Sequence, residues 1–218
     1  MPDQQTLLST KATYIRAGDG ANTNYGSYVQ MYVRWKGDNI NNASRALIEF
    51  DLAQLVPQLP AQVIQARLRL SYNGGTGINH GPDFNVACHR LTAAWVEMQA
   101  TWNNRQSGTP WGTPGGDLAS PPVVTIFSPK LTVWTTEYFD ITQLLKDWLA
   151  GTHPNYGVLL KPEDEPPGDP TLYYVVYEAD DSTQAEQYKP ALVVDYDLTV
   201  PVAEEPSAIP VLIRRRRR

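Results

Sequence analysis

The residues best suited to chemistry in this sequence are aromatic and basic side chains. Trp111 lies in a stretch rich in Gly and Pro, and Trp35 precedes Lys36-Gly37-Asp38. An exposed indole presents a flat apolar face on which a pyranose ring can stack. We therefore expect both indoles to be exposed, and they are candidate contacts for a sugar.

Arg67 and Arg69 alternate with apolar residues in segment 64–72, so they share one face of the strand that this alternation predicts. A guanidinium pairs bidentately with a carboxylate, which makes the two residues candidate contacts for an acidic sugar. The alternative is that both are solvated residues on an exposed face.

Asp19, Asn22 and Asn24, with the backbone near Gly26, form an oxygen-rich turn. Ca²⁺ takes six to eight oxygen ligands from carboxylates, amides and carbonyls, so the turn is a candidate calcium site. The alternative, which we favour, is a set of Asx turns in which these side chains satisfy nearby backbone N–H groups.

No catalytic arrangement is recognisable in the sequence. The single cysteine, Cys88, lies in the middle of an apolar segment, where a thiol is buried and unreactive. The three histidines lack the spacing of a metal-binding motif, and no Gly-x-Ser-x-Gly is present. We therefore expect that the protein is not an enzyme.

The charge of the chain is unevenly distributed. The net charge is −5, but positions 1–198 hold 13 basic and 21 acidic residues, and Arg214–Arg218 form a basic run. An acidic body argues against nucleic acid as a partner and does not steer a polyanion toward the protein. No run approaches the roughly 20 apolar residues of a membrane span. The start of the chain has no basic or apolar region typical of a classical secretory signal.

Short alternating or apolar segments separated by turn residues predict the architecture. They favour an all-β fold, a jelly-roll-like antiparallel β-sandwich. The predicted strands are 13–16, 29–35, 45–51, 64–72, 84–91, 123–127, 132–139, 156–161, 172–178 and 191–197. Long loops are expected over 103–122 and 161–170.

One short amphipathic helix is expected after Asp140. This residue is a candidate N-cap, Gln143 stands three positions later as in a capping box, and Gly151 is a plausible stop. The apolar stripe of the helix is Ile141, Leu144, Leu145, Trp148 and Leu149.

The segment after the last predicted strand has a different composition. We expect one domain over 1–197 and an extended proline-containing tail over 198–218 that is too short to form its own core. The apolar part of the tail could add a strand to a partner, with the arginines as an electrostatic clasp. The candidate docking residues are Ile209, Val211, Leu212, Ile213, Arg214, Arg215, Arg216, Arg217 and Arg218.

A series of motifs in order along the chain resembles a known family. They are 22–26 (NTNYG), 66–70 (ARLRL), 95–104 (WVEMQATWNN), 115–117 (GGD), 139–142 (FDIT), 148–151 (WLAG), 154–158 (PNYGV) and 189–194 (KPALVV). Together they resemble the DNRLRE domain family, which includes the family 96 carbohydrate-binding modules and is similar to the disaggregatase-related repeats. The resemblance spans residues 12–197.

The resemblance implies a jelly-roll-like sandwich of extracellular or cell-surface proteins, and some relatives bind acidic polysaccharides such as alginate. Trp95, Trp102 and Trp148 match family positions, and we expect them to pack in the core rather than to contact sugar.

Two functions remain open from the sequence. The first is a non-catalytic binding module for a cell-surface or extracellular polysaccharide. The alternative is a structural or accessory (decoration) subunit of a larger extracellular, phage-like or filament assembly, docked on other subunits through the tail. Either function implies an extracellular or particle-associated protein.

Overall fold

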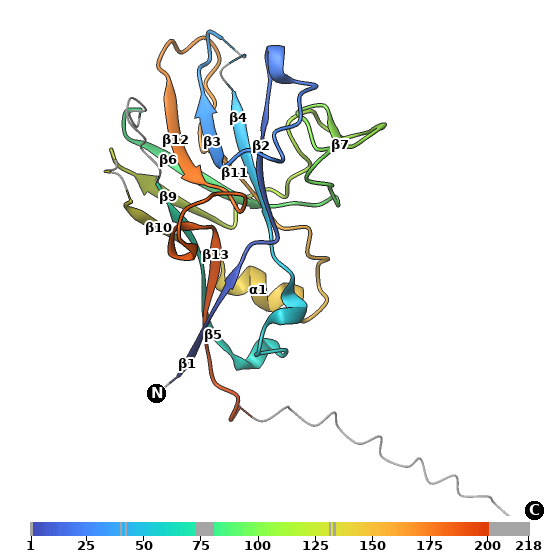
Figure 1. The fold of residues 1–218 in the computed structure, drawn as a ribbon, viewed down its shortest axis with the longest axis vertical. Helices are drawn as coiled ribbons and strands as arrows, with labels where there is room; N and C mark the ends of the chain where they lie inside the picture. The colour runs from blue at the N-terminus through green and yellow to red at the C-terminus, as the bar shows by residue number, and fades with distance from the viewer. Residues whose placement is uncertain are drawn as a thin grey trace, which may run out of the picture.

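A computed structural model describes residues 2–39, 41, 43–72, 81–130, 132 and 134–200. In this part of the chain two antiparallel sheets pack against each other, and the helix α1 (Thr142–Leu149) packs against the smaller sheet (Figure 1). The prediction of an all-β sandwich with one short helix is confirmed. The predicted docking residues in 209–218 lie outside the described residues, so the docking role stays a prediction.

The smaller sheet contains four strands. Their order is β1 (Asp3–Leu8), β13 (Ala191–Tyr196), β5 (Val63–Ser71) and β10 (Thr136–Asp140). In β5, Ala66, Leu68 and Leu70 are fully buried, whereas Arg67 and Arg69 are half-buried on the opposite face. The alternation in the sequence therefore decides which face of this sheet packs on the core.

The larger sheet contains the remaining long strands. Their order is β12 (Tyr173–Glu178), β3 (Gln30–Trp35), β4 (Ser44–Glu49), β11 (Val158–Pro162), β6 (Phe84–Arg90) and β9 (Val124–Ser128), and β2 (Lys11–Arg16) pairs with β4. At Ser44 the register places Arg16 of β2 opposite one edge of β4 and Arg34 of β3 opposite the other. The three residues therefore form a row across three strands and project from one face.

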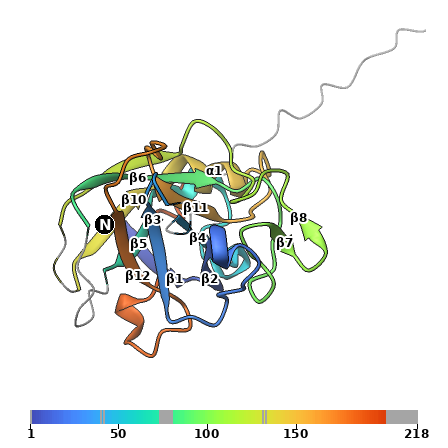
Figure 2. The same cartoon turned by 90° about the horizontal axis from the view of Figure 1, so that it is seen from above.

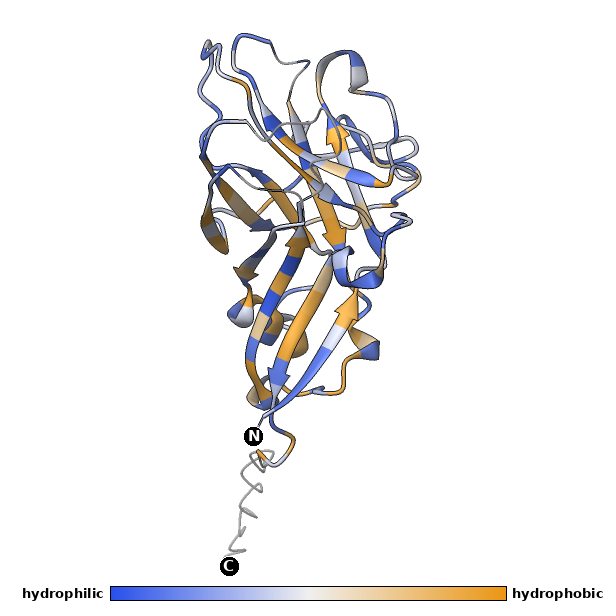
Figure 3. Ribbon diagram, turned by 60° about the vertical axis from the view of Figure 1, so that its left-hand side comes forward, coloured by the Kyte–Doolittle hydropathy of each residue, from blue (hydrophilic) through white to orange (hydrophobic). Residues whose placement is uncertain are grey.

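Both sheets contribute to one apolar core. Ala46, Ile48 and Val86 of the larger sheet share this core with Leu68 and Leu192 of the smaller one. The most hydrophobic residues accordingly follow the strands through the middle of the molecule, while polar residues concentrate in the loops (Figure 3).

A second apolar cluster covers the other face of the larger sheet. Here Ile15 and Leu47 pack with Trp95 and Trp111, which come from the long segment after β6. The prediction of an irregular loop over 103–122 is wrong in part, because the segment includes the hairpin β7 (Asn104–Gln106) and β8 (Thr109–Pro110), seen at one side in Figure 2.

The expectation that Trp111 is exposed is wrong. Its side chain is only 3% exposed, and its indole N–H donates to the carbonyl of Thr101 at 2.8 Å. The Gly- and Pro-rich segment around it packs on the larger sheet, and the Trp111 ring lies between the two, against Ile15 and Leu47. A ring buried in this way presents no face to a sugar.

The helix forms where the sequence predicts it, but its N-terminal cap differs. The N-cap is Ile141 and not Asp140, because the helix begins at Thr142; Asp140 Oδ1 still accepts the Thr142 N–H at 2.9 Å. Gly151 adopts φ +70° after the last turn. Gln143 does not complete a capping box, because its amide donates to Asp147 Oδ1 at 2.8 Å instead. Leu144, Leu145 and Trp148 are buried, as the apolar stripe predicts.

Strand β1 is absent from the prediction. Its first four residues, Asp3-Gln4-Gln5-Thr6, are polar, and only Leu7 of the strand is buried. A strand at the edge of a sheet needs little apolar side chain, because one backbone edge and one face meet water. The strand therefore pairs with β13 without showing the alternation of apolar and polar residues by which a strand is predicted.

Candidate functional site

A groove lined with tyrosine and arginine side chains lies on the larger sheet, over the row formed by Arg16, Ser44 and Arg34. Its volume is about 400 Å³. The lining residues are Tyr14, Arg16, Thr23, Tyr25, Tyr28, Tyr32, Arg34 and Ser44. Strands β2, β3 and β4 supply the floor, and the segment between β2 and β3 supplies one wall.

The four tyrosine rings of the groove contact one another. Tyr14 and Tyr25 stack with their centroids 4.3 Å apart and their planes inclined by 22°. Tyr32 meets Tyr14 edge-on at 5.0 Å, and Tyr28 meets Tyr25 edge-on at 5.1 Å. Tyr14 and Tyr25 are buried, whereas Tyr28 is 49% exposed. The groove therefore has a rigid aromatic base and one ring that is open to solvent.

The two arginines give the groove its positive charge. Arg16 Nε donates to the carbonyl of Asn41 at 2.9 Å, while Arg34 Nε is buried without a hydrogen-bond partner. Within the described residues, neither guanidinium lies within 4.0 Å of a carboxylate. Burial and the charge of Arg16 lower the pKa of Arg34. The groove thus holds two neighbouring cations, and no acidic side chain of the described residues pairs with either one.

The hydroxyls of Tyr14 and Tyr32 stay protonated beside these cations. Burial raises the pKa of Tyr14 well above its ordinary value, with the neighbouring Tyr25 as the next cause, and burial also raises the pKa of Tyr32. A neutral phenol both donates and accepts a hydrogen bond, and a guanidinium only donates. The polar side chains of the groove therefore suit a ligand rich in acceptors and negatively charged.

The segment 95–103 supports the groove wall from behind. Asn24 Nδ2 donates to the carbonyls of Glu97 at 2.7 Å and Ala100 at 2.8 Å. A Cβ on Gly26 would lie 2.6 Å from the Glu97 carbonyl oxygen. The wall that carries Tyr25 is thus fixed to this segment by backbone contacts.

Other residues of segment 95–103 tie it to the sheet. The Glu97 carboxylate accepts the Ala12 N–H of β2 at 2.7 Å, and the Trp95 indole N–H donates to the Tyr156 carbonyl at 3.0 Å. The Arg45 guanidinium lies 4.9 Å from the Trp102 ring centroid. Trp95 and Trp102 therefore have structural roles next to the groove, since their contacts hold this segment against the sheet.

The comparison with known families agrees with the motifs of the sequence. A family model of carbohydrate-binding module family 96 matches residues 3–196. The chain belongs to carbohydrate-binding module family 96. No curated protein matches the chain. The family match covers both sheets, and every lining residue of the groove lies within it.

The structure of this family 96 module places Arg67 and Arg69 away from the groove, on the outer face of the smaller sheet. Arg67 Nη2 donates to Asp195 Oδ2 at 2.9 Å, and Arg69 Nη2 donates to the Glu186 carbonyl at 3.0 Å. Their role as sugar contacts stays a prediction, with each guanidinium already bonded within the protein.

Trp35 also lies outside the groove. It is half-buried at the end of β3, and its indole N–H donates to the Pro166 carbonyl at 3.1 Å. Tyr173 is its partner across the β3–β12 pair. The expectation of an exposed indole is therefore met only in part, and a contact between Trp35 and sugar stays a prediction.

The candidate calcium residues are engaged in bonds between loops. Asp19 Oδ2 accepts from Asn41 Nδ2 at 3.1 Å, and Asn22 Oδ1 accepts from Asn103 Nδ2 at 2.8 Å. Asn24 Oδ1 accepts the Gly26 N–H at 3.1 Å, so the interpretation of Asn24 as an Asx turn is confirmed. The described residues contain no cluster of three or more His, Cys, Asp or Glu side chains arranged for a metal ion, and calcium binding stays a prediction.

Cys88 lies where the sequence places it, in the middle of β6. Its thiol is fully buried, and burial raises its pKa to about 12. His89 projects from the opposite face, and its Nδ1 lies 2.9 Å from the Ala119 carbonyl oxygen. Among the helices of the described residues, none has the length and apolar character to cross a membrane.

The sequence analysis missed the groove residues. A signal was present, because Tyr14-Ile15-Arg16 and Tyr32-Val33-Arg34 repeat one Tyr-aliphatic-Arg pattern in two predicted strands. Alternation puts the tyrosine and arginine of each triplet on the same face. The sequence does not predict which strands pair, and it is the pairing of β2 and β3 with β4 that brings both triplets to Ser44.

Proposed function

We propose that this family 96 module binds an acidic polysaccharide, such as alginate, in the tyrosine–arginine groove and does not catalyse its cleavage. The observation that carries the proposal is the row of Arg16, Ser44 and Arg34, with two guanidiniums and no balancing carboxylate in the described residues. Family membership supports carbohydrate as the general class of ligand.

The spacing of the row suits successive charged groups of a polymer. Neighbouring strands lie about 4.8 Å apart, so the Cα atoms of Arg16 and Arg34 are about 10 Å apart across β4. Long arginine side chains can converge on one carboxylate or reach two along a chain of uronic acids. Each charge-assisted pair is stronger than a neutral hydrogen bond.

The tyrosines would supply the apolar part of recognition. A pyranose ring presents C–H groups that pack on an aromatic face, and Tyr28 is the groove ring most open to solvent. The acidic body of the chain does not prevent binding of a polyanion, because charges beyond about 8 Å are largely screened at physiological ionic strength.

Calorimetry with alginate oligosaccharides tests the proposal. The double variant Arg16→Ala/Arg34→Ala should bind at least about tenfold more weakly than the native protein, since it loses two charge-assisted contacts. The variant Arg67→Ala on the smaller sheet is the matched control and should bind as the native protein does. Equal binding by all three proteins would contradict the proposal.

A second readout addresses catalysis. Native protein incubated with alginate should release no new reducing ends and no unsaturated products. Release of either product, abolished in a groove variant, would show that the module is an enzyme.

A further inference from the structure

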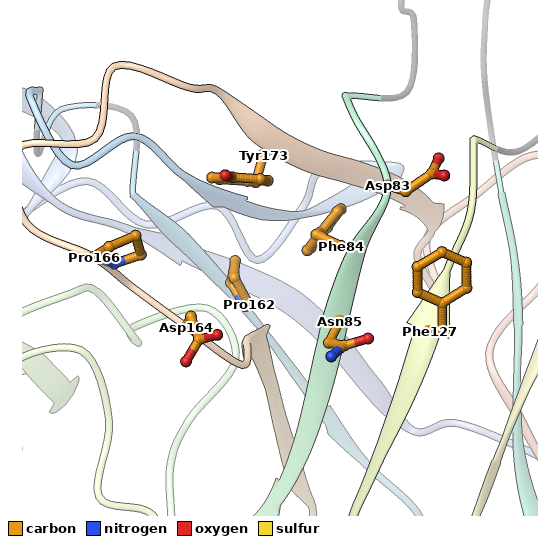
Figure 4. Close-up of a pocket in the computed structure, with 8 residues that line it drawn as sticks. All are labelled: Asp83, Phe84, Asn85, Phe127, Pro162, Asp164, Pro166 and Tyr173. Carbon is orange, nitrogen blue, oxygen red and sulfur yellow. The ribbon is translucent and has the colours of Figure 1, made fainter.

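A second pocket opens on the larger sheet, apart from the groove residues. It has a volume of about 400 Å³ and lies between the first residues of β6, the strand β9, the loop after β11 and the first residue of β12 (Figure 4). None of its lining residues belongs to the tyrosine–arginine groove. This pocket therefore needs an explanation of its own.

Aromatic rings form one part of the pocket. Phe127 of β9 is 63% exposed, which is unusual for a phenylalanine on a strand. Tyr173 is half-buried, with its ring centroid 6.0 Å from that of Phe84. Trp35 supports this side of the pocket, because its indole N–H holds the carbonyl of Pro166, a lining residue.

The polar part of the pocket consists of oxygen acceptors. Asp83 uses one carboxylate oxygen to accept the Lys130 N–H at 2.8 Å. Asn85 donates its amide N–H to Glu163 Oε2 at 2.8 Å, and this leaves its own Oδ1 as an acceptor. Within the described residues, Asp83 and Asp164 form no ion pair. In Figure 4, Asn85 follows Phe84 along the strand, Asp164 lies beside Pro162, and the Asp83 carboxylate points away from both.

The geometry points to a site for one uncharged pyranose. Its hydroxyl groups would donate to Asn85 Oδ1 and Asp164, and its apolar face would lie on Phe127 or Tyr173. The carboxylates of Asp83 and Asp164 repel an acidic sugar, so this pocket excludes the charged sugars that the groove is proposed to bind. A cavity of about 400 Å³ is large enough for one sugar unit. The inference rests on membership of a carbohydrate-binding family, and it is independent of the ligand proposed for the groove.

Saturation-transfer NMR of the full chain with neutral methyl glycosides of glucose, galactose, mannose, xylose and fucose tests this inference. At least one glycoside should bind, and calorimetry should give at least about tenfold weaker binding for Phe127→Ala and for Asp164→Ala. The control Tyr138→Ala removes an exposed ring from the smaller sheet and should leave glycoside binding unchanged. The double variant Arg16→Ala/Arg34→Ala should also retain it.

Three outcomes would overturn the inference. These are no binding of any of the five glycosides, equal binding by the pocket variants and the native protein, or binding of spermidine in place of the glycosides, which would make the pocket a site for organic cations. Alginate binding by the same variants distinguishes a failure of this inference from a failure of the groove proposal. The pocket variants should bind alginate as the native protein does. The groove variant should lose alginate binding and still bind the glycoside.

Discussion

At the scale of single residues, two equally exposed tyrosines lie in different electrostatic surroundings. Tyr28 and Tyr138 have nearly equal exposure, at 49% and 47%. Tyr28 lies beside the unbalanced arginines of the groove, whereas the guanidinium above Tyr138 belongs to Arg67, which is paired with Asp195. Exposure alone therefore does not identify a binding ring, and the charge around it must be considered.

This difference predicts the effect of two matched substitutions. Tyr28→Ala should weaken alginate binding by about 1 kcal/mol, because one aromatic face is lost from the groove. Tyr138→Ala should leave the dissociation constant unchanged. Calorimetry on both variants checks the prediction, and it fails if Tyr138→Ala weakens binding as much as Tyr28→Ala does.

Ion pairs provide a second contrast between residues. Arg45 donates to both carboxylate oxygens of Glu165, at 3.1 and 2.7 Å, and to the Gly115 carbonyl at 2.8 Å. Both side chains of this pair are about 13–14% exposed, whereas Asp38, paired with Lys36, is 40% exposed. The Arg45 pair joins β4 to two loops, so its loss should affect the fold more.

Glu165→Gln should lower the free energy of unfolding by about 2 kcal/mol, because it leaves a mostly buried guanidinium without its counter-charge. Asp38→Asn should lower it by less than about 0.5 kcal/mol. Urea titrations of both variants give these values. A Glu165→Gln effect no larger than that of Asp38→Asn would show that the buried pair does not hold the loops.

At the scale of elements, the segment 95–103 links the groove wall to β2 through a carboxyl group with a shifted pKa. Burial, together with the nearby Asp180 and Asp181, raises the pKa of Glu97 to about 7, although the hydrogen bond from the Ala12 N–H and the charge of Lys11 lower it in part. Burial and Asp181 also raise the pKa of Asp180 to about 6. Both carboxyl groups are thus easier to protonate in the folded protein than in the unfolded chain.

The sign of the pH effect follows from this shift. The folded state binds more protons than the unfolded state between the ordinary carboxyl pKa and about 7, so stability falls as pH rises through this window. The native protein should lose about 2 kcal/mol between pH 5 and pH 8 through these groups. Glu97→Gln keeps an oxygen that accepts the Ala12 N–H, and it should lose clearly less over the same range.

Urea unfolding of the native protein and Glu97→Gln at both pH values measures this difference. Identical pH dependence in the two proteins would mean that Glu97 does not titrate as its burial indicates. The measurement also bears on the groove, since the same segment positions Tyr25 through Asn24.

The elements also show what the sequence could and could not predict. Strand β5 was predictable because one face is apolar and the other carries Arg67 and Arg69. Strand β1 was not, since it lies at an edge and buries a single side chain. The position of Trp111 depends on a cover folding over the second face of the larger sheet, a tertiary event that local composition does not encode. The groove depends in the same way on strand register, which brings together residues that are distant in sequence.

At the scale of the whole molecule, the two concave sites lie on the larger sheet and differ in charge. The groove presents two cations among tyrosines, and the second pocket presents carboxylates beside Phe127. One module could thus contact acidic and neutral sugars at separate places. This arrangement would suit a surface made of mixed polysaccharides.

Removing residues 198–218 separates the module from the predicted docking tail. We expect the truncated protein to bind alginate as tightly as the full chain does, because all groove residues lie in the body. If the tail docks on an assembly, only the full chain should sediment with large particles from its source. Weaker alginate binding after truncation would show that the arginine run contributes to the ligand contact.

The measurement that tests the central claim most directly is an NMR titration of the isotopically labelled protein with a defined acidic oligosaccharide of alginate. The account predicts that the largest shift changes follow Arg16, Tyr28, Tyr32 and Arg34, with smaller ones in the wall near Asn24. Changes confined to the smaller sheet around Arg67 and Arg69, or to the pocket around Phe127, would contradict the assignment of the groove as the binding site.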